Sequence, residues 1–376
     1  MRILMVSNGY GEDAMGAVLG RALRRYGAEV LAYPLVGLGH AYQAVGVPVL
    51  DPRRTLPTAG FGFRTGWREA WEDLRAGWIS LTLAQRRTLR RQHGTCDEAV
   101  AIGDLFCLWM AAATGIRPVY VPTAKSEYSE PHQPWELLLI RRWARVSFPR
   151  DPLTAERYRK AGLAAVCVGN LMMDCLEFGK EAFEYAPDEP VVLLLPGSRR
   201  DAPVNFRLLL QTAARVAAVH REVRWLCALS PTVDPASLAR AAGAELLEGQ
   251  MAYRGVRVRL TRSFADAVRQ ATVVLGMSGT ANEQAAGLGK PVVALPGPGP
   301  QFTRKFLALQ ARLLGEALVP AEGPEEAARA VLRLLADPEE RARRGEVGRA
   351  RMGPPGAAEG LAAWLVSRRG QTEDRI

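Results

Sequence analysis

Residues that bind metals or form cross-links are scarce in this sequence. It contains 5 cysteines and 4 histidines among 376 residues, and the cysteines show no C-x-x-C spacing. We therefore expect the cysteines to be small core residues in a reducing compartment. The histidines are scattered and a D-x-D motif is absent, so the sequence offers no metal site.

Long uninterrupted apolar runs are also absent. The longest, Ala99 to Ile116, is interrupted by Asp104 and is too short to span a bilayer. The first residues, MRILMVSNG, read as a core strand without a signal-peptide pattern. We expect a cytosolic protein, or one that binds a membrane surface without crossing it.

The composition is that of a globular protein with a large core. Hydrophobic residues make up 48% of the chain, and 376 residues exceed the usual size of one core, so two domains are expected. The chain has 49 Lys and Arg residues against 39 Asp and Glu residues, which gives a net charge of +10. This excess leaves nucleic acid, an anionic membrane surface and phosphorylated ligands open as partners.

Short apolar strands alternate with helical segments along the chain, which predicts an α/β fold with doubly wound parallel sheets. The predicted strands are Ile3 to Val6, Glu29 to Tyr33, Val47 to Leu50, Ala99 to Ile102, Val119 to Pro122, Arg145 to Phe148, Ala165 to Val168, Val191 to Leu195, Arg224 to Leu229, Val256 to Leu260, Thr272 to Leu275 and Pro291 to Leu295. An acidic segment bounded by proline, 177–190, has little apolar pattern and is predicted to be a linker. We expect an N-terminal domain at 1–176, a C-terminal domain at 191–352, and a last helix in 353–376 that can pack back on the N-terminal domain.

Asp104 follows the strand Ala99 to Ile102 and precedes a helix that begins at Leu105. Ligands of open α/β sheets bind beyond the carboxyl ends of the strands, so Asp104 is placed to act as a general base. Asp is also a frequent helix N-cap, and one residue can do both. Asn8, Gly9 and Gly11 follow the first strand and leave room for a ligand, although the dinucleotide fingerprint is not met.

Two corners of small residues in the second half resemble phosphate sites. Ser278, Gly279 and Thr280 separate the strand Thr272 to Leu275 from the next helix. Free N–H groups at a helix start favour anions, so this corner is a candidate for a phosphate. The sequence LPGSRRD places Gly197, Ser198 and Arg199 at a similar corner, where a guanidinium adds charge-assisted donors.

A tryptophan-rich stripe occupies Gly60 to Gln92. Trp67, Trp71, Leu74 and Trp78 recur at helical spacing with arginines between them. The stripe indicates either an amphipathic helix pair packed on its own sheet or a contact with a membrane surface.

Four motifs resemble the lipid-A-disaccharide synthase family, which are membrane-surface glycosyltransferases of the GT-B fold. The motifs are VGNLMMD, LLPGSRRD, MSGTANEQAAGLGKPVVALPG and PQFTRK. The resemblance is strongest from Val168 to Leu314 and is nearer to a related branch of unspecified substrate. It implies two Rossmann-like domains facing a cleft, a UDP-sugar held by the C-terminal domain, an acceptor held by the N-terminal one, and neither metal nor cofactor.

The resemblance also assigns roles to residues. Asp104 matches the catalytic carboxylate, although the proline that normally precedes it is missing, and Gly197, Ser198 and Arg199 match the donor phosphate site. The remaining substrate-binding candidates are Ser278, Gly279, Thr280, Glu283, Gln284, Asn8, Gly9, Gly11, Asn170 and Gln301. Counting back from Pro291, the ribose-binding Glu of the family falls on Gln284, with Glu283 one place earlier, so both remain candidates.

We expect an inverting, metal-independent glycosyltransferase that moves a sugar of glucosamine type, acylated or not, from a UDP-sugar to a lipid-linked acceptor. The alternatives are a UDP-sugar 2-epimerase of the same fold and a basic nucleic-acid-binding protein, which lacks a recognised binding motif here. The expected partners are the UDP-sugar, the lipid-linked acceptor and an anionic membrane surface, without nucleic acid; a homodimer is left open. The expected location is cytoplasmic, on the cytosolic face of the inner membrane.

Overall fold

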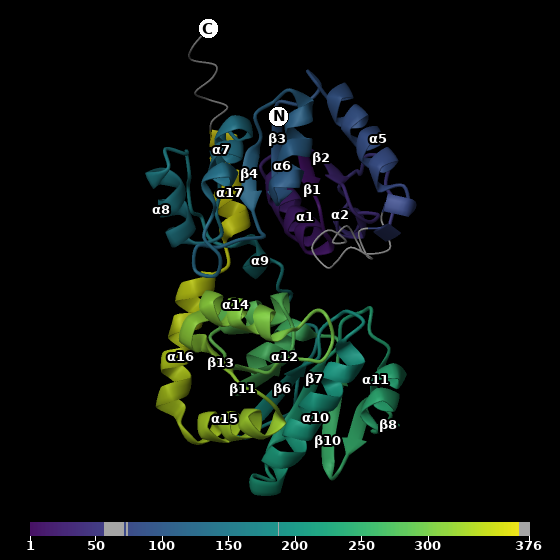
Figure 1. The fold of residues 1–376 in the computed structure, drawn as a ribbon, viewed down its shortest axis with the longest axis vertical. Coiled ribbons are helices and arrows are strands. Elements are labelled where there is room, and N and C mark those ends of the chain that lie inside the picture. Colours follow the sequence, from purple (N-terminus) through teal and green to yellow (C-terminus); the bar gives the residue numbers. More distant parts are fainter. Residues whose placement is uncertain (56–70, 73, 187, 368–376) are drawn as a thin grey trace. The chain divides into compact units, whose positions relative to one another are not determined.

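The computed structural model describes residues 1–55, 71–72, 74–186 and 188–367, and these form two compact units (Figure 1). Unit 1 consists of Met1–Cys175 and the chain from Pro354 onward, and unit 2 is Leu176–Gly353. Each unit has its own sheet with helices around it. No helix in the described part of the chain is long and apolar enough to cross a membrane.

Unit 1 is built on a sheet of five parallel strands in the order β2-β1-β3-β4-β5. The strands are β1 (Arg2–Ser7), β2 (Glu29–Pro34), β3 (Glu98–Gly103), β4 (Val119–Pro122) and β5 (Val146–Ser147). The helices are α1 (Tyr10–Arg25), α2 (His40–Ala44), α5 (Trp78–Arg91), α6 (Leu105–Ala111), α7 (Pro134–Trp143), α8 (Pro152–Lys160), α9 (Leu171–Asp174) and α17 (Ala357–Ser367), with a short 3₁₀ turn η1 (Ala112–Thr114). β1 and β3 are near-continuous apolar runs, as expected for strands buried on both faces.

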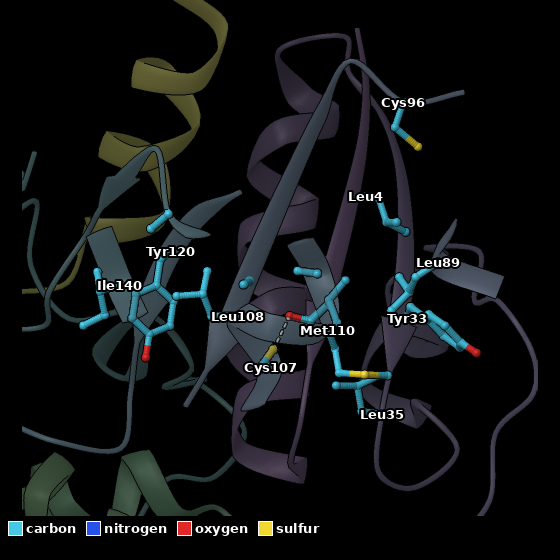
Figure 2. Packing of buried hydrophobic residues seen from close by; sticks show 14 of the residues in the cluster. Leu4, Tyr33, Leu35, Leu89, Cys96, Cys107, Leu108, Met110, Tyr120 and Ile140 are labelled. Carbon is cyan, nitrogen blue, oxygen red and sulfur yellow. Dashed lines mark hydrogen bonds between the residues drawn. The ribbon is translucent and has the colours of Figure 1, made fainter. Parts of the chain in front are cut away.

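The core of unit 1 is formed between the sheet and its helices. Figure 2 shows Tyr33, Leu89, Leu108 and Met110 in this cluster. Cys107 of α6 is buried there, and its Sγ donates to the carbonyl of Val6 at 3.2 Å. The expectation that this cysteine is a small core residue is confirmed.

The tryptophan-rich stripe lies only partly in the described residues, since Phe61, Phe63 and Trp67 fall outside them. Trp78 begins α5 and its ring packs on Phe106 of α6, with ring centroids 6.0 Å apart. Leu81 and Leu89 of the same helix are buried, so α5 packs on its own unit as an amphipathic helix. Trp71, by contrast, is 60% exposed.

α17, drawn in yellow in Figure 1, belongs to unit 1 although it lies near the end of the chain. It packs against α1 and α9. Asp174 of α9 accepts a hydrogen bond from the backbone N–H of Ala358 at 2.8 Å, and the ring of Trp364 meets Phe148 edge-on at 4.9 Å.

Unit 2 is built on an eight-stranded sheet in the order β13-β12-β11-β6-β7-β10-β9-β8. The strands are β6 (Val191–Leu195), β7 (Arg224–Ala228), β8 (Glu245–Leu247), β9 (Gln250–Tyr253), β10 (Val256–Thr261), β11 (Val273–Gly276), β12 (Val292–Ala294) and β13 (Leu318–Pro320). The helices are α10 (Ala202–Val219), α11 (Pro235–Ala242), α12 (Phe264–Gln270), α13 (Thr280–Gly287), α14 (Arg304–Leu314), α15 (Pro324–Ala336) and α16 (Pro338–Met352), with a 3₁₀ turn η2 (Gly315–Ala317). The strands pair in parallel except for the antiparallel hairpin β8–β9 and its pairing with β10.

Two predicted strands of unit 1 are wrong. The segment Val47 to Leu50 makes only a single bridge, between Val49 and Ala32, because Pro48 has no N–H to continue a ladder. The segment Ala165 to Val168 likewise makes one bridge, to Ser147, since β5 at the sheet edge is only two residues long.

The segment predicted as a linker, 177–190, groups with unit 2. The carboxylate of Asp266 accepts hydrogen bonds from the backbone N–H groups of Gly179, Lys180 and Glu181 at 2.8 to 3.0 Å. Glu181 also pairs with Arg259 at 2.7 Å. These contacts hold the segment against its own sheet.

Candidate functional site

Asp104 lies where β3 ends and α6 begins. Its Oδ1 accepts hydrogen bonds from the backbone N–H groups of Phe106 and Cys107 at 3.0 and 3.1 Å, so the helix-cap interpretation is confirmed. The same oxygen accepts a hydrogen bond from Nδ2 of Asn8 at 2.7 Å. β1 and β3 are neighbours in the sheet, which is why residues 96 positions apart meet at its carboxyl edge.

Gly103 makes this approach sterically possible. Its φ is +150°, and a Cβ at this position would lie 1.9 Å from Oδ1 of Asn8. Glycine at position 103 therefore lets the side-chain amide of Asn8 reach the carboxylate of Asp104. The pair of Asn8 and Asp104 is therefore fixed by the backbone as well as by hydrogen bonds.

Asp104 also lines a pocket of about 190 Å³ in unit 1. The pocket is bounded by α6, α7 and the residues that follow β4, and its polar lining includes Lys125, His132 and Glu136. Lys125 pairs with Glu136 at 2.9 Å and with Glu130 at 3.2 Å. Despite burial, which lowers it, the pKa of Lys125 is raised by the hydrogen bonds to Glu136 and Glu130, so the ammonium is retained.

This polar lining was not predicted, because the segment TAKSEYSEPHQPWE has no apolar period and its sequence indicates only a loop. Two signals could have found it. The segment follows β4, which neighbours β3, so its first residues reach the same edge of the sheet as Asp104. The capping box of Gln133 and Glu136 marks the start of α7, which brings Trp135 and Glu136 back to that edge.

The loop after β1 contains the other predicted unit 1 residues. Gly9 is the N-cap of α1 with extended backbone, and Gly11 has open space where a Cβ would lie. Beneath them a buried network joins Asp13 to Ser7 at 2.6 Å and Ser7 to the hydroxyl of Tyr42 at 2.9 Å. Burial raises the pKa of Asp13 to about 7, against the hydrogen bond from Ser7, which lowers it.

The two glycine corners of unit 2 lie next to each other, because β6 and β11 are adjacent strands. Gly197 has φ +94°, and a Cβ there would lie 3.2 Å from the carbonyl oxygen of Met277. The backbone N–H of Met277 donates to the carbonyl of Leu195 at 2.8 Å. The structure thus brings the predicted residues Gly197, Ser198 and Arg199 together with Ser278, Gly279 and Thr280.

The buried side-chain amides of Asn282 and Gln310 stabilise the corner at Ser278 to Thr280. Asn282 donates to Gln310 at 2.9 Å, and Gln310 donates to the carbonyls of Ser278 and Gly279 at 3.2 and 2.9 Å. Gly279 is the N-cap of α13 and supplies no side-chain cap. Backbone N–H groups of this first turn are therefore available to an anion.

Gln301 joins the same edge through Asp201, which accepts a hydrogen bond from the Gln301 backbone N–H at 2.9 Å. Glu283 and Gln284 both lie on α13, but Gln284 is 8% exposed whereas Glu283 is only half-buried. Glu283 is therefore the more accessible of the two.

Asn170 has a structural role. It is the N-cap of α9, where its Oδ1 accepts from the N–H of Met172 at 3.1 Å, and its side chain is buried. It is not among the described residues that line the pocket beside Asp104.

Comparison with known proteins agrees with this architecture. No protein-family model matches the chain. Over 157 residues the chain is 34% identical to a lipid-A-disaccharide synthase of Azoarcus sp. (strain BH72), a match that covers 39% of this chain and 37% of that protein. The chain therefore matches little more than a third of the length of this curated relative.

Solved structures resemble the chain along nearly its whole length. A putative UDP-N-acetylglucosamine 2-epimerase from Listeria monocytogenes has a TM-score of 0.65 at 14% identity and covers 100% of this chain and 98% of its own. CalG4, the calicheamicin glycosyltransferase, has a TM-score of 0.64 at 19% identity, with 97% and 98% covered. The fold is the GT-B fold expected from the sequence, and the resemblance to lipid-A-disaccharide synthase is confirmed over the matched residues.

Proposed function

We propose that the protein is an inverting, metal-independent glycosyltransferase that moves a sugar from a UDP-sugar to a lipid-linked sugar acceptor. The sugars are of glucosamine type, acylated or not, as in the synthesis of a lipid A disaccharide. The observation that carries the proposal is the carboxylate of Asp104, held by Asn8 at the carboxyl edge of the unit 1 sheet and open to a pocket. The matched stretch of the Azoarcus enzyme supports the choice of substrate class.

In the proposed reaction Asp104 is the general base. The acceptor oxygen forms a bond to the anomeric carbon while the bond from that carbon to the β-phosphate oxygen breaks, and the acceptor proton passes to the carboxylate. The three N–H donors on Oδ1, from Asn8, Phe106 and Cys107, fix the orientation of the carboxylate. Such positioning is worth several kcal/mol of activation free energy in well-ordered active sites.

The glycine corners of unit 2 are the proposed donor site. The positive φ of Gly197 and the uncapped first turn of α13 present backbone N–H groups to a diphosphate. Arg199, beside Gly197, would add a charge-assisted bond that strengthens as UDP departs. We assign the ribose to Glu283, because Gln284 is buried, and further donor contacts to Ser278, Gly279, Thr280 and Gln301.

A specific observation also favours a second candidate, since the 2-epimerase from Listeria monocytogenes has the same fold over 100% of this chain. Incubation with UDP-N-acetylglucosamine alone, followed by NMR, separates the two. A glycosyltransferase leaves the sugar nucleotide largely intact until an acceptor lipid is added and then releases UDP. Conversion to a new UDP-sugar without acceptor would identify an epimerase and overturn the proposal.

A peripheral position on the cytosolic face of the inner membrane is part of the proposal, because a lipid-linked acceptor must be met at a bilayer. Trp71 is the most exposed tryptophan described in the predicted membrane stripe. Its ring lies 5.7 Å from the guanidinium carbon of Arg75. An aromatic ring beside a cation suits the headgroup region of an anionic membrane.

A further inference from the structure

We infer that unit 2 carries a second anion site, which binds a phosphate group, either free or in a lipid headgroup. The site lies at the amino ends of β11 and β12, where Thr272 and Pro291 precede the two strands. The glycine corners proposed for the donor follow the carboxyl ends of β6 and β11. The new site therefore lies at the amino ends of the parallel strands, and the proposed donor site lies at their carboxyl ends.

Four cationic side chains line a pocket of about 500 Å³ at this edge. They are Arg269 at the end of α12, Lys290 in the turn before β12, and Arg341 and Arg349 on α16. No acidic residue is among the described residues that line the pocket. A concave surface lined by charges of one sign concentrates the field and attracts the opposite ion.

The protein neutralises only part of this charge. Asp266 pairs with Arg269 at 3.1 Å, but this carboxylate also accepts three backbone N–H groups from the segment Gly179–Glu181. Lys290 donates to the carbonyl of Arg269 at 2.9 Å, and that carbonyl carries only a partial charge. Burial lowers the pKa of Lys290, and the nearby Arg349 lowers it further.

Helix capping explains two of the cations. Arg341 donates to the carbonyls of Leu334 and Leu335 at the end of α15, and Lys290 donates to the end of α12. Helix capping does not account for the position of Arg349, because the described contacts of its side chain include neither a carboxylate nor a carbonyl partner. A phosphate in the pocket would meet Arg349 and the remaining N–H donors of Lys290 and Arg341 together.

The backbone frame of the pocket is tightly packed, so the chain positions that carry Lys290 and Arg349 lie close together. A Cβ on Gly345 of α16 would lie 2.3 Å from the carbonyl oxygen of Gly289, and one on Gly348 would lie 2.2 Å from that of Ala286. These glycines let α16 approach the end of α13. A fixed backbone frame limits the freedom that is lost when an anion binds between these side chains.

Inorganic phosphate is the first probe, titrated into the full chain by isothermal calorimetry at low salt. Lys290→Met combined with Arg349→Met should weaken phosphate binding by about tenfold or more, since two charged donors are lost. Arg349→Met alone, which removes an exposed side chain without a described hydrogen bond, should weaken it several-fold while leaving the fold intact. Arg215→Met with Arg312→Met removes the same charge from exposed helix positions of unit 2 outside the pocket and should leave binding unchanged.

Vesicles separate the two sources of phosphate. If the ligand is a headgroup, phosphatidylglycerol vesicles should bind the wild type, and the Lys290/Arg349 variant should bind them less than the Arg215/Arg312 variant does. If vesicle binding is equal in both variants while inorganic phosphate binding is lost only in the former, the ligand is a free phosphate. The site is overturned if the Lys290/Arg349 and Arg215/Arg312 variants bind phosphate equally and bind vesicles equally. It is also overturned if the wild type binds neither phosphate nor vesicles. Arg199→Ala, which tests the donor site through UDP binding, should leave phosphate binding at this pocket unchanged. The two proposals can therefore fail independently of each other.

Discussion

The amide of Asn8 donates a hydrogen bond to the carboxylate of Asp104 at 2.7 Å, across the ends of two adjacent strands. Gly103 is needed for that approach, because a side chain there would overlap the amide oxygen of Asn8. Asp104 is thus held by three donors, two of which belong to the helix that it caps. A role in capping and a role in catalysis are compatible in this geometry, and mutations can separate them.

Asp104→Asn should keep the helix cap and remove the base. If Asp104 takes the acceptor proton, turnover should fall by about 100-fold or more, while UDP binding stays unchanged. Steady-state kinetics and calorimetry with UDP measure the two effects. Near-normal turnover would leave Asp104 with only its role as a cap.

Asn8 should act as a positioning residue for Asp104. Asn8→Ala removes the donor and should reduce turnover by about tenfold with little effect on UDP affinity. Asn8→Asp places a second carboxylate beside the first, so the acid limb of the turnover–pH profile should move to higher pH, because like charges favour retention of a proton. If Asn8→Ala lowers stability but the pH profile of Asn8→Asp matches that of the wild type, Asn8 supports only the fold.

Arg199→Ala should weaken UDP binding by about 1.5 to 3 kcal/mol through loss of a charge-assisted hydrogen bond. Arg200→Ala removes the same charge from the adjacent exposed position and serves as the control. Calorimetry with UDP distinguishes the two variants. Equal affinities in both would remove Arg199 from the donor site.

The elements that could be predicted from sequence are those with local signals. β3 and α6 around Asp104 were expected from an apolar run followed by a capping residue, and the glycine corners were expected from small residues between strand and helix. The hairpin β8–β9 was missed because β8 is exposed along its length and shows no buried alternation.

The contacts that complete each site are long-range and carry no local signal. Asn8 and Asp104 are joined only because β1 lies beside β3, and sequence spacing does not fix strand order. Gly197 and Met277 meet for the same reason, through β6 and β11. Lys125 and Glu136 were expected only as parts of a loop, and their place in the pocket follows from the position of β4.

Asp13 should make stability depend on pH. Burial raises the pKa of Asp13 from its ordinary value of 3.8 to about 7 in the folded protein, so the folded state holds the proton more tightly. The contribution of Asp13 to the free energy of unfolding should therefore be greatest below about pH 4. It should be lost as the pH rises toward 7, and the total loss is at most about 4 kcal/mol. Urea unfolding at pH 5 and pH 8 measures the loss.

Asp13→Asn should flatten this slope, because an amide does not ionise. Asp51→Asn is the control: the hydrogen bond from Arg53 lowers the pKa of this exposed carboxyl, so its titration lies below the window. An unchanged slope in Asp13→Asn would assign the pH dependence to other groups.

The membrane prediction can be tested at Trp71, which is 60% exposed, together with Trp67. Wild-type protein should bind anionic vesicles and release them as salt rises, since each well-placed Arg contributes about 1 kcal/mol at such a surface. Replacing Trp67 and Trp71 by Ser should reduce vesicle binding and leave UDP binding intact, because the indole rings are lost from the interface and not from the donor site. Trp135→Ser removes a similarly exposed indole, 57% accessible, from α7 and should bind vesicles normally. If the wild type ignores vesicles and the double variant unfolds or aggregates, the stripe is ordinary core and the protein meets its acceptor by another surface.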